Sequence, residues 1–153
     1  MLSSTNTIAP NVLRTPQLSS GGQLLLWSMR QWVASIRQGR CAGCDLRAPY
    51  NDLDCIRAIS ELHEMMCVLS RSARRAIDIY QPAELVISRD ERTLLQIVAT
   101  ACPYSLRYST RRAMEGLLHG DGRELLEAAR QYREDIERVG LNVEGWGELR
   151  VVH

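Results

Sequence analysis

The chain has 153 residues, 45% of them apolar, which is sufficient for one domain with a single hydrophobic core. Its 19 basic residues are all Arg and are balanced by 18 acidic residues, so the net charge provides no general attraction for nucleic acid or an anionic membrane. The five cysteines are an odd number, which argues against a disulfide framework and favours a reducing compartment.

The start of the chain lacks the basic stretch and apolar core of a signal peptide. Wholly apolar runs such as Leu24–Trp27 are far shorter than the roughly 20 residues that a membrane-spanning helix needs. We therefore expect a soluble, cytoplasmic protein that does not enter a membrane.

Three segments are predicted. Residues 1–20 are rich in Ser, Thr, Asn and Pro, which is typical of a flexible arm that is disordered or docks in an extended form. Helical patterns then cover residues 21–141. The last residues, 142–153, alternate loosely around Trp146 and predict a short extended tail packed on the helical domain.

The first helix is predicted to run from about Gly21 to Gly39, since Gly is favourable directly after a helix end. Trp27 lies nearly opposite the apolar face of this helix, because two residues of helix turn about 200°. Trp27 therefore needs another neighbour, either the arm or a loop of the same chain, or a partner protein. The apolar face itself consists of Leu25, Leu26, Met29, Trp32, Val33 and Ile36.

Residues 51–80 form the longest uninterrupted helical pattern. Asn51 is a suitable N-cap, and Pro82 cannot continue the helix. Apolar residues recur at spacings of three and four along one narrow face, which predicts the central helix of a bundle. These residues are Cys55, Ile59, Leu62, Met66, Leu69, Ala73, Ala76 and Tyr80.

Three further helices are predicted from cap signals. Ser88 and Glu91 form a capping box that opens the third helix, Ser105 can cap the fourth, and Asp121 with Glu124 begins the fifth. Gly140 and Leu141 are typical of a Schellman ending. The fold class is therefore all-α: a single antiparallel bundle of about five helices around residues 51–80.

A metal site is one hypothesis. Cys41 and Cys44 have the spacing of a zinc knuckle, and His63 and Cys67 share one helix face four residues apart. Together they could close a tetrahedral zinc site. The knuckle lacks a Pro or Gly after its second Cys, and only one such pair is present. We therefore favour packing without a metal and expect no other cofactor. Thiol redox chemistry of Cys41 and Cys44 alone is a weaker alternative, because no predicted strand precedes them as in a thioredoxin-like unit.

DNA binding is a second hypothesis. The helices predicted within residues 88–118 could form a helix-turn-helix, with Arg107, Arg111 and Arg112 on the exposed side of its second helix. The near-neutral charge and the absence of a small residue in the turn count against it. Nucleic acid is therefore an alternative partner, ranked below protein.

Catalytic patterns are missing from the sequence. The three histidines, His63, His119 and His153, are far apart in the chain. We find no nucleophilic Ser elbow and no phosphate-binding Gly loop. We therefore expect no enzyme activity, and no motif identifies a family.

Interaction with a protein is the function ranked first. Arg71, Arg74 and Arg75 are predicted on the outer face of the central helix, and Trp27 lies outside its own helix stripe. Trp and Arg are enriched among residues that dominate binding energy at interfaces. We expect a small non-enzymatic adaptor, regulator or accessory subunit, whose partner is another protein or a second copy of the chain.

Overall fold

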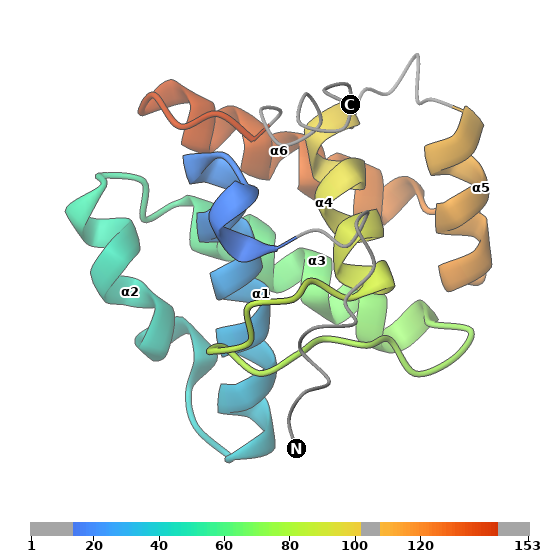
Figure 1. The fold of residues 1–153 in the computed structure, drawn as a ribbon, viewed down its shortest axis with the longest axis horizontal. Coiled ribbons are helices and arrows are strands. Elements are labelled where there is room, and N and C mark those ends of the chain that lie inside the picture. The colour runs from blue at the N-terminus through green and yellow to red at the C-terminus, as the bar shows by residue number, and fades with distance from the viewer. Residues whose placement is uncertain (1–13, 102–107, 144–153) are drawn as a thin grey trace, which may run out of the picture.

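The computed structural model describes residues 14–101 and 108–143. Within these residues it contains six α-helices, one short 3-10 helix and no β-strand (Figure 1), so the all-α prediction is confirmed for this part of the chain. The elements in chain order are η2 (Thr15–Gln17), α1 (Ser20–Arg37), α2 (Ala42–Asp52), α3 (Ala58–Ser72), α4 (Arg89–Thr100), α5 (Tyr108–Leu117) and α6 (Arg123–Arg138).

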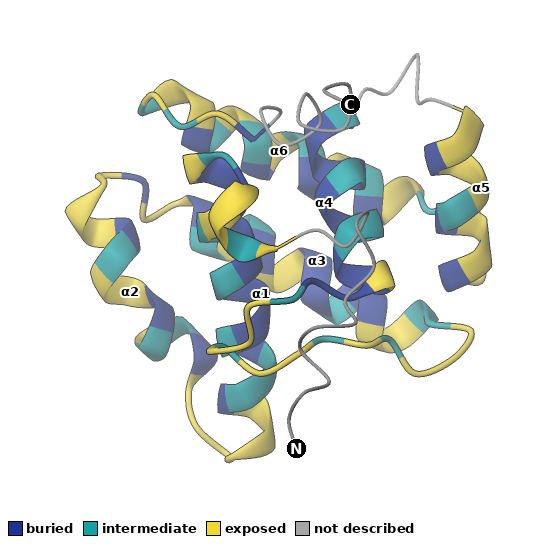
Figure 2. Cartoon of the chain, viewed as in Figure 1, coloured by how far each residue is buried: buried dark blue, intermediate teal, exposed yellow. Residues whose placement is uncertain are grey.

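The helix α3 packs against α1, α2 and α6, and α4 packs against α1, α5 and α6. Buried residues face the space between the helices and exposed residues face outwards (Figure 2). None of the described helices is both long and apolar enough to cross a membrane. Fully buried apolar side chains include Leu25, Leu26, Met29, Leu46, Leu62, Met65, Leu94 and Leu95.

The prediction of one helix over residues 51–80 is wrong at both ends. The first residues of this stretch close α2, which ends at Asp52, so Asn51 is not an N-cap. The break before α3 includes Asp54, whose φ of 59° lies in the left-handed region that interrupts a helix. At the other end, α3 stops at Ser72 and the chain continues in an extended form.

Tertiary hydrogen bonds explain why residues 73–80 are not helical. The backbone N–H of Asp78 donates to Asp90 Oδ2 at 2.8 Å. The backbone N–H of Tyr80 donates to Glu91 Oε2 at 2.8 Å. Both acceptors are in the first turn of α4. Charge-assisted hydrogen bonds of this kind are stronger than the neutral bonds that a continued helix would offer.

A buried ion pair fixes the rest of this connection on α1. The Arg30 guanidinium donates through Nε and Nη2 to the two carboxylate oxygens of Glu91, at 2.8 and 2.9 Å. It also donates to the carbonyls of Glu84 and Val86 at 2.6 and 2.9 Å. Both charged side chains are at most 1% exposed. The pair therefore ties α1 to the start of α4 and to the loop before it.

The helix α2 was not predicted from the sequence, which contains Gly43 and Pro49 within it. Its place is fixed partly by a chain of buried hydroxyl groups. The Tyr132 hydroxyl of α6 bonds that of Tyr50 at 2.7 Å, and Tyr50 bonds Ser28 Oγ of α1 at 2.7 Å. Burial raises the pKa of Tyr50 to about 12, so its hydroxyl stays protonated at neutral pH.

Two predicted helix ends are confirmed. Ser88 Oγ accepts the backbone N–H of Glu91, and the Glu91 carboxylate accepts that of Ser88, as in a capping box. After α6, Gly140 has a φ of 91° and the N–H of Leu141 donates to Ile136 O at 3.1 Å, which is the Schellman pattern.

The segment that leads into α1 contacts two parts of the chain that are distant in sequence. Thr15 donates a backbone hydrogen bond to the loop before α4, and Gly21 donates one to Asn142 O at 3.1 Å. A Cβ on Gly21 would lie 2.8 Å from that oxygen, so this close approach requires Gly. The remainder of the predicted arm and tail, residues 1–13 and 144–153, lies outside the described residues.

Also in α1, Ile36 is 49% exposed, so its assignment to the apolar face was wrong. The helix is otherwise close to the prediction, because it begins after the N-cap Ser19 and ends at Arg37. Gly39 has a φ of 70° and closes the helix in the predicted position.

The interface between α3 and α6 contains a carboxyl group with a shifted pKa. Burial, with a further contribution from Asp135, raises the pKa of Glu61 from 4.5 to about 7. Its Oε1 atom is buried and has no hydrogen-bond partner among the described residues. Because the folded-state pKa is the higher one, protonated Glu61 stabilises the fold below about pH 4.5, and this contribution is lost as the pH rises through about 7.

We expect Glu61→Gln to raise the free energy of unfolding at pH 8 and to flatten its pH dependence between pH 5 and pH 8. A neutral amide removes the cost of a half-buried carboxylate that lies beside the like charge of Asp135. Urea unfolding at both pH values measures this, with the exposed Glu64→Gln as the control. An unchanged pH dependence in Glu61→Gln would contradict the assignment.

Candidate functional site

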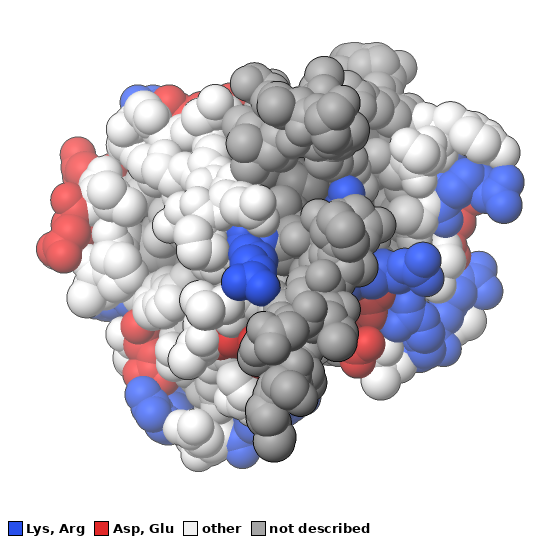
Figure 3. All heavy atoms as spheres, viewed as in Figure 1, with Lys and Arg blue, Asp and Glu red and all other residues white. Residues whose placement is uncertain are grey.

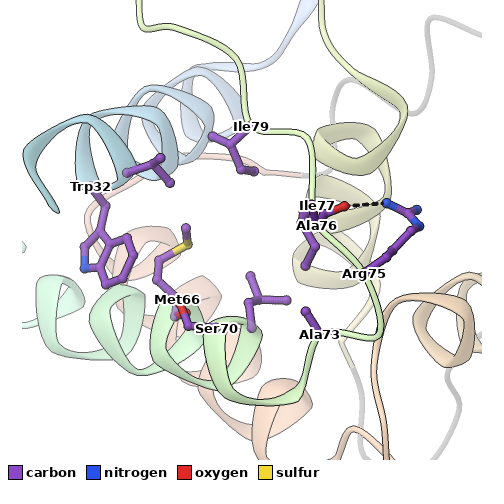
Figure 4. A pocket seen from close by; sticks show the side chains of 10 residues that line it. Trp32, Met66, Ser70, Ala73, Arg75, Ala76, Ile77 and Ile79 are labelled. Atoms are coloured by element: carbon purple, nitrogen blue, oxygen red, sulfur yellow. Dashed lines mark hydrogen bonds between the residues drawn. The ribbon is translucent and has the colours of Figure 1, made fainter. Parts of the chain in front are cut away.

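An apolar groove lies between α1, α3 and the extended chain after α3 (Figure 4). Its volume is about 360 Å³, at the lower end of the roughly 300–1,000 Å³ usual for binding pockets. The buried side chains of Trp32, Met66 and Leu69 form part of its wall, and half-buried and exposed side chains surround them. The lining residues are Trp32, Val33, Met66, Leu69, Ser70, Ala73, Arg75, Ala76, Ile77 and Ile79.

The groove offers few polar groups to a ligand. Only Ser70 and Arg75 among its lining residues are polar. The Arg75 guanidinium is directed away from the apolar side chains (Figure 4), and it donates to Ala76 O and to both carboxylate oxygens of Asp90 at 2.8–2.9 Å. A polar small molecule needs several convergent polar groups, so the groove is better suited to apolar side chains.

The sequence does not predict this groove, because Ile77 and Ile79 fall inside the helix expected over residues 51–80. The signal that identifies an extended segment is the alternation of apolar Ile77 and Ile79 with polar Asp78.

The four residues predicted to bind a partner all make contacts within the chain. Trp27 is half-buried and packs against the core. Arg71 Nη2 is 3.8 Å from a carboxylate oxygen of Glu124. Arg74 Nε donates to two backbone carbonyls at the end of α5, at 2.8 and 2.9 Å. Arg75 pairs with Asp90, as described above.

The placement of this Arg cluster on one helix was wrong, because α3 ends before Arg74 and Arg75. Arg side chains nevertheless gather over α5 and the chain that follows α3 (Figure 3). The carbonyl partners of Arg74 do not neutralise its charge, and the contact of the exposed Arg71 with Glu124 is long. Of these three Arg residues only Arg75 lines the groove, and its charge is paired with Asp90.

A second cavity, of about 480 Å³, shares the wall residue Trp32 with the groove. Cys41, Cys44 and His63 all line it. Cys41 is the N-cap of α2, and its Sγ accepts the backbone N–H of Cys44 at 3.2 Å. The structure therefore brings three of the four predicted metal ligands to one cavity.

Both ring nitrogens of His63 have neighbours. Nδ1 accepts the indole N–H of Trp32 at 3.1 Å, and Nε2 lies 3.4 Å from Cys67 Sγ. With Nδ1 as acceptor, the neutral ring carries its proton on Nε2 and cannot also take the proton of Cys67. His63 is therefore not arranged to act as a general base for the Cys67 thiol.

Among residues 14–101 and 108–143, no three His, Cys, Asp or Glu side chains are grouped so that they could hold a metal ion. Zinc binding by Cys41, Cys44, His63 and Cys67 therefore stays a prediction, and it requires both pairs to converge. Elemental analysis of protein purified without chelator tests it.

The predicted helix-turn-helix is described only in part. Residues 102–107, which include Arg107, lie outside the described part of the chain. Arg111 and Arg112 are exposed on α5. Arg112 Nη1 donates to the Tyr108 hydroxyl at 2.8 Å. DNA binding by this pair stays a prediction, which a gel shift at low salt tests.

No protein-family model, curated protein or solved structure matches the chain. Its function is therefore inferred from its own residues.

Proposed function

We propose that this chain is a small non-enzymatic interaction protein of the cytoplasm, an adaptor, regulator or accessory subunit. In this proposal the groove between α1 and α3 binds an apolar segment of a partner protein. The observation that carries the proposal is the groove, in which eight of the ten lining residues are apolar. Filling it would remove apolar surface from water, at roughly 25 cal/mol for each Å² buried.

The Arg residues around the end of α3 indicate the chemistry of the partner. Arg71 and Arg75 have side chains that are 54% and 52% exposed, and Arg74 has only carbonyl partners for its Nε. Because Asp90 already pairs with Arg75, an acidic residue beside the apolar segment would find its compensating charge at Arg71 and Arg74. Such rim contacts contribute more to association rate and specificity than to affinity.

We expect Ile79→Asp and Val33→Asp to weaken partner binding about tenfold or more, because each places a carboxylate in an apolar wall of the groove. Affinity capture from the source cell with mass spectrometry identifies the partner of the parent chain. Titration of that purified partner then gives the dissociation constants. The two variants change different walls, so a folding defect in one does not decide the result.

The matched control is Leu85→Asp, because Leu85 is 57% exposed and does not line the groove. Equal affinities for parent, Ile79→Asp and Val33→Asp would contradict the proposal. Light scattering on the pure chain distinguishes a homodimer from a foreign partner.

For Trp27→Ala we expect a loss of stability, because this side chain packs against the core.

A further inference from the structure

The Cys41 and Cys44 thiols lie at the N-terminus of α2 and are both exposed. Residues three apart on a helix have Cβ atoms about 5–6 Å apart. A disulfide needs a Cβ separation of about 3.5–4.5 Å. Cys41 is the N-cap and has an extended backbone, with φ −77° and ψ 107°, so its side chain is not held in the helical lattice. Closing the disulfide therefore requires this exposed first turn of α2 to adjust.

The cavity beside this dithiol provides room for a small co-reactant. It is open to solvent, and Trp32, Leu46 and Ile59 contribute apolar side chains to its wall. Arg47 contributes a guanidinium group that can pair with a carboxylate. This combination fits a peptide-like disulfide that carries carboxylates, such as oxidised glutathione.

We propose that Cys41 and Cys44 are a redox-active dithiol that forms an intramolecular disulfide by exchange with low-molecular-weight disulfides, Cys41 attacking and Cys44 resolving. This inference is independent of partner binding in the groove. In a reducing compartment the pair stands reduced and is oxidised when small disulfides accumulate.

The exchange proceeds in two steps. The Cys41 thiolate attacks one sulfur of the small disulfide, the disulfide bond breaks, and the released thiolate takes a proton from solvent. Cys44 then loses its proton to solvent and its sulfur attacks Cys41 Sγ, which releases the second small thiol in the same way. Two electrons pass from the protein dithiol to the small disulfide, and the protons balance.

The hydrogen bonds distinguish the two thiols. The backbone N–H of Cys44 donates to Cys41 Sγ at 3.2 Å, and Cys41 is the N-cap at the positive end of the α2 dipole. Both features stabilise a thiolate on Cys41, and the nearby Asp45 carboxylate is paired with Arg40 at 2.8 Å. Because the thiolate is the nucleophile, Cys41 attacks first.

The test is incubation of the full chain with oxidised glutathione, followed by alkylation, trypsin digestion and mass spectrometry. Cleavage after Arg40 and Arg47 releases Cys41 and Cys44 in one peptide that contains no other cysteine, and each other cysteine falls in a different peptide. We expect the 41–47 peptide to become lighter by two hydrogens and resistant to alkylation. Cys55, which is buried and whose pKa is raised by burial, serves as the internal control.

Two variants assign the roles. In Cys44→Ser, a mixed disulfide with glutathione should accumulate on Cys41. In Cys41→Ser, which keeps a good N-cap for α2, Cys44 should react about tenfold more slowly. Circular dichroism checks that both variants are folded. Three results would overturn the proposal: no disulfide in the 41–47 peptide, equal reactivity of Cys41 and Cys44 in the two variants, or zinc bound stoichiometrically to this pair.

Discussion

Replacing Arg30 with Met is expected to lower the free energy of unfolding by about 3–5 kcal/mol, because it leaves the Glu91 carboxylate charged and unpaired in the core. Glu91 would retain only the backbone N–H groups of Tyr80 and Ser88 as donors among the contacts described above. Neutral N–H groups cannot balance the negative charge of the Glu91 carboxylate. The loops tied to Arg30 through Glu84 and Val86 would also lose two hydrogen bonds. Urea unfolding measures the effect.

The control is Arg123→Met, since Arg123 is 88% exposed and lies 3.9 Å from its acidic neighbour. Exposed pairs contribute about 0–1 kcal/mol. The double variant Arg30→Met/Glu91→Gln should be less destabilised than the sum of the two single variants, because the amide removes the buried charge. A change below about 1 kcal/mol in Arg30→Met would show that the ion pair does not hold the connection to α4.

Replacing Leu62 with Ala is expected to cost about 2–5 kcal/mol, as is usual for a fully buried Leu. Leu62 is in the second turn of α3, the helix that packs against α1, α2 and α6, and it is 0% exposed. The substitution removes apolar contacts and leaves a cavity that a close-packed interior fills only partly. Urea midpoints of parent and variant give the comparison.

Ile36→Ala is the matched control, because Ile36 is also apolar and helical but is 49% exposed. We expect a change within about 0.5 kcal/mol for this surface substitution. Equal urea midpoints for Leu62→Ala and the parent would mean that α3 does not carry the core.

The candidate sites were only partly predictable from the sequence. The sequence shows the spacing of Cys41 and Cys44. The different reactivity of the two thiols depends on α2 beginning between them, and the sequence did not predict that helix. The groove depends on Ile77 and Ile79 being extended, and their segment was predicted to be helical. The sequence showed that Arg71, Arg74 and Arg75 lie close together in the chain. It did not show their partners, which lie on α4, α5 and α6.

The sequence by itself determined the all-α class, the capping box at Ser88 and the Schellman ending at Gly140. Caps and periodicity are interactions within one or two helical turns, so nearby residues suffice to predict them. Only the tertiary structure decided where residues 51–80 stop being helical. There the outcome depends on Arg30 and Glu91, which are 61 positions apart and pair in a buried environment. Helical periodicity carries no information about such a partner, and its charge-assisted hydrogen bonds outweigh a weak local preference.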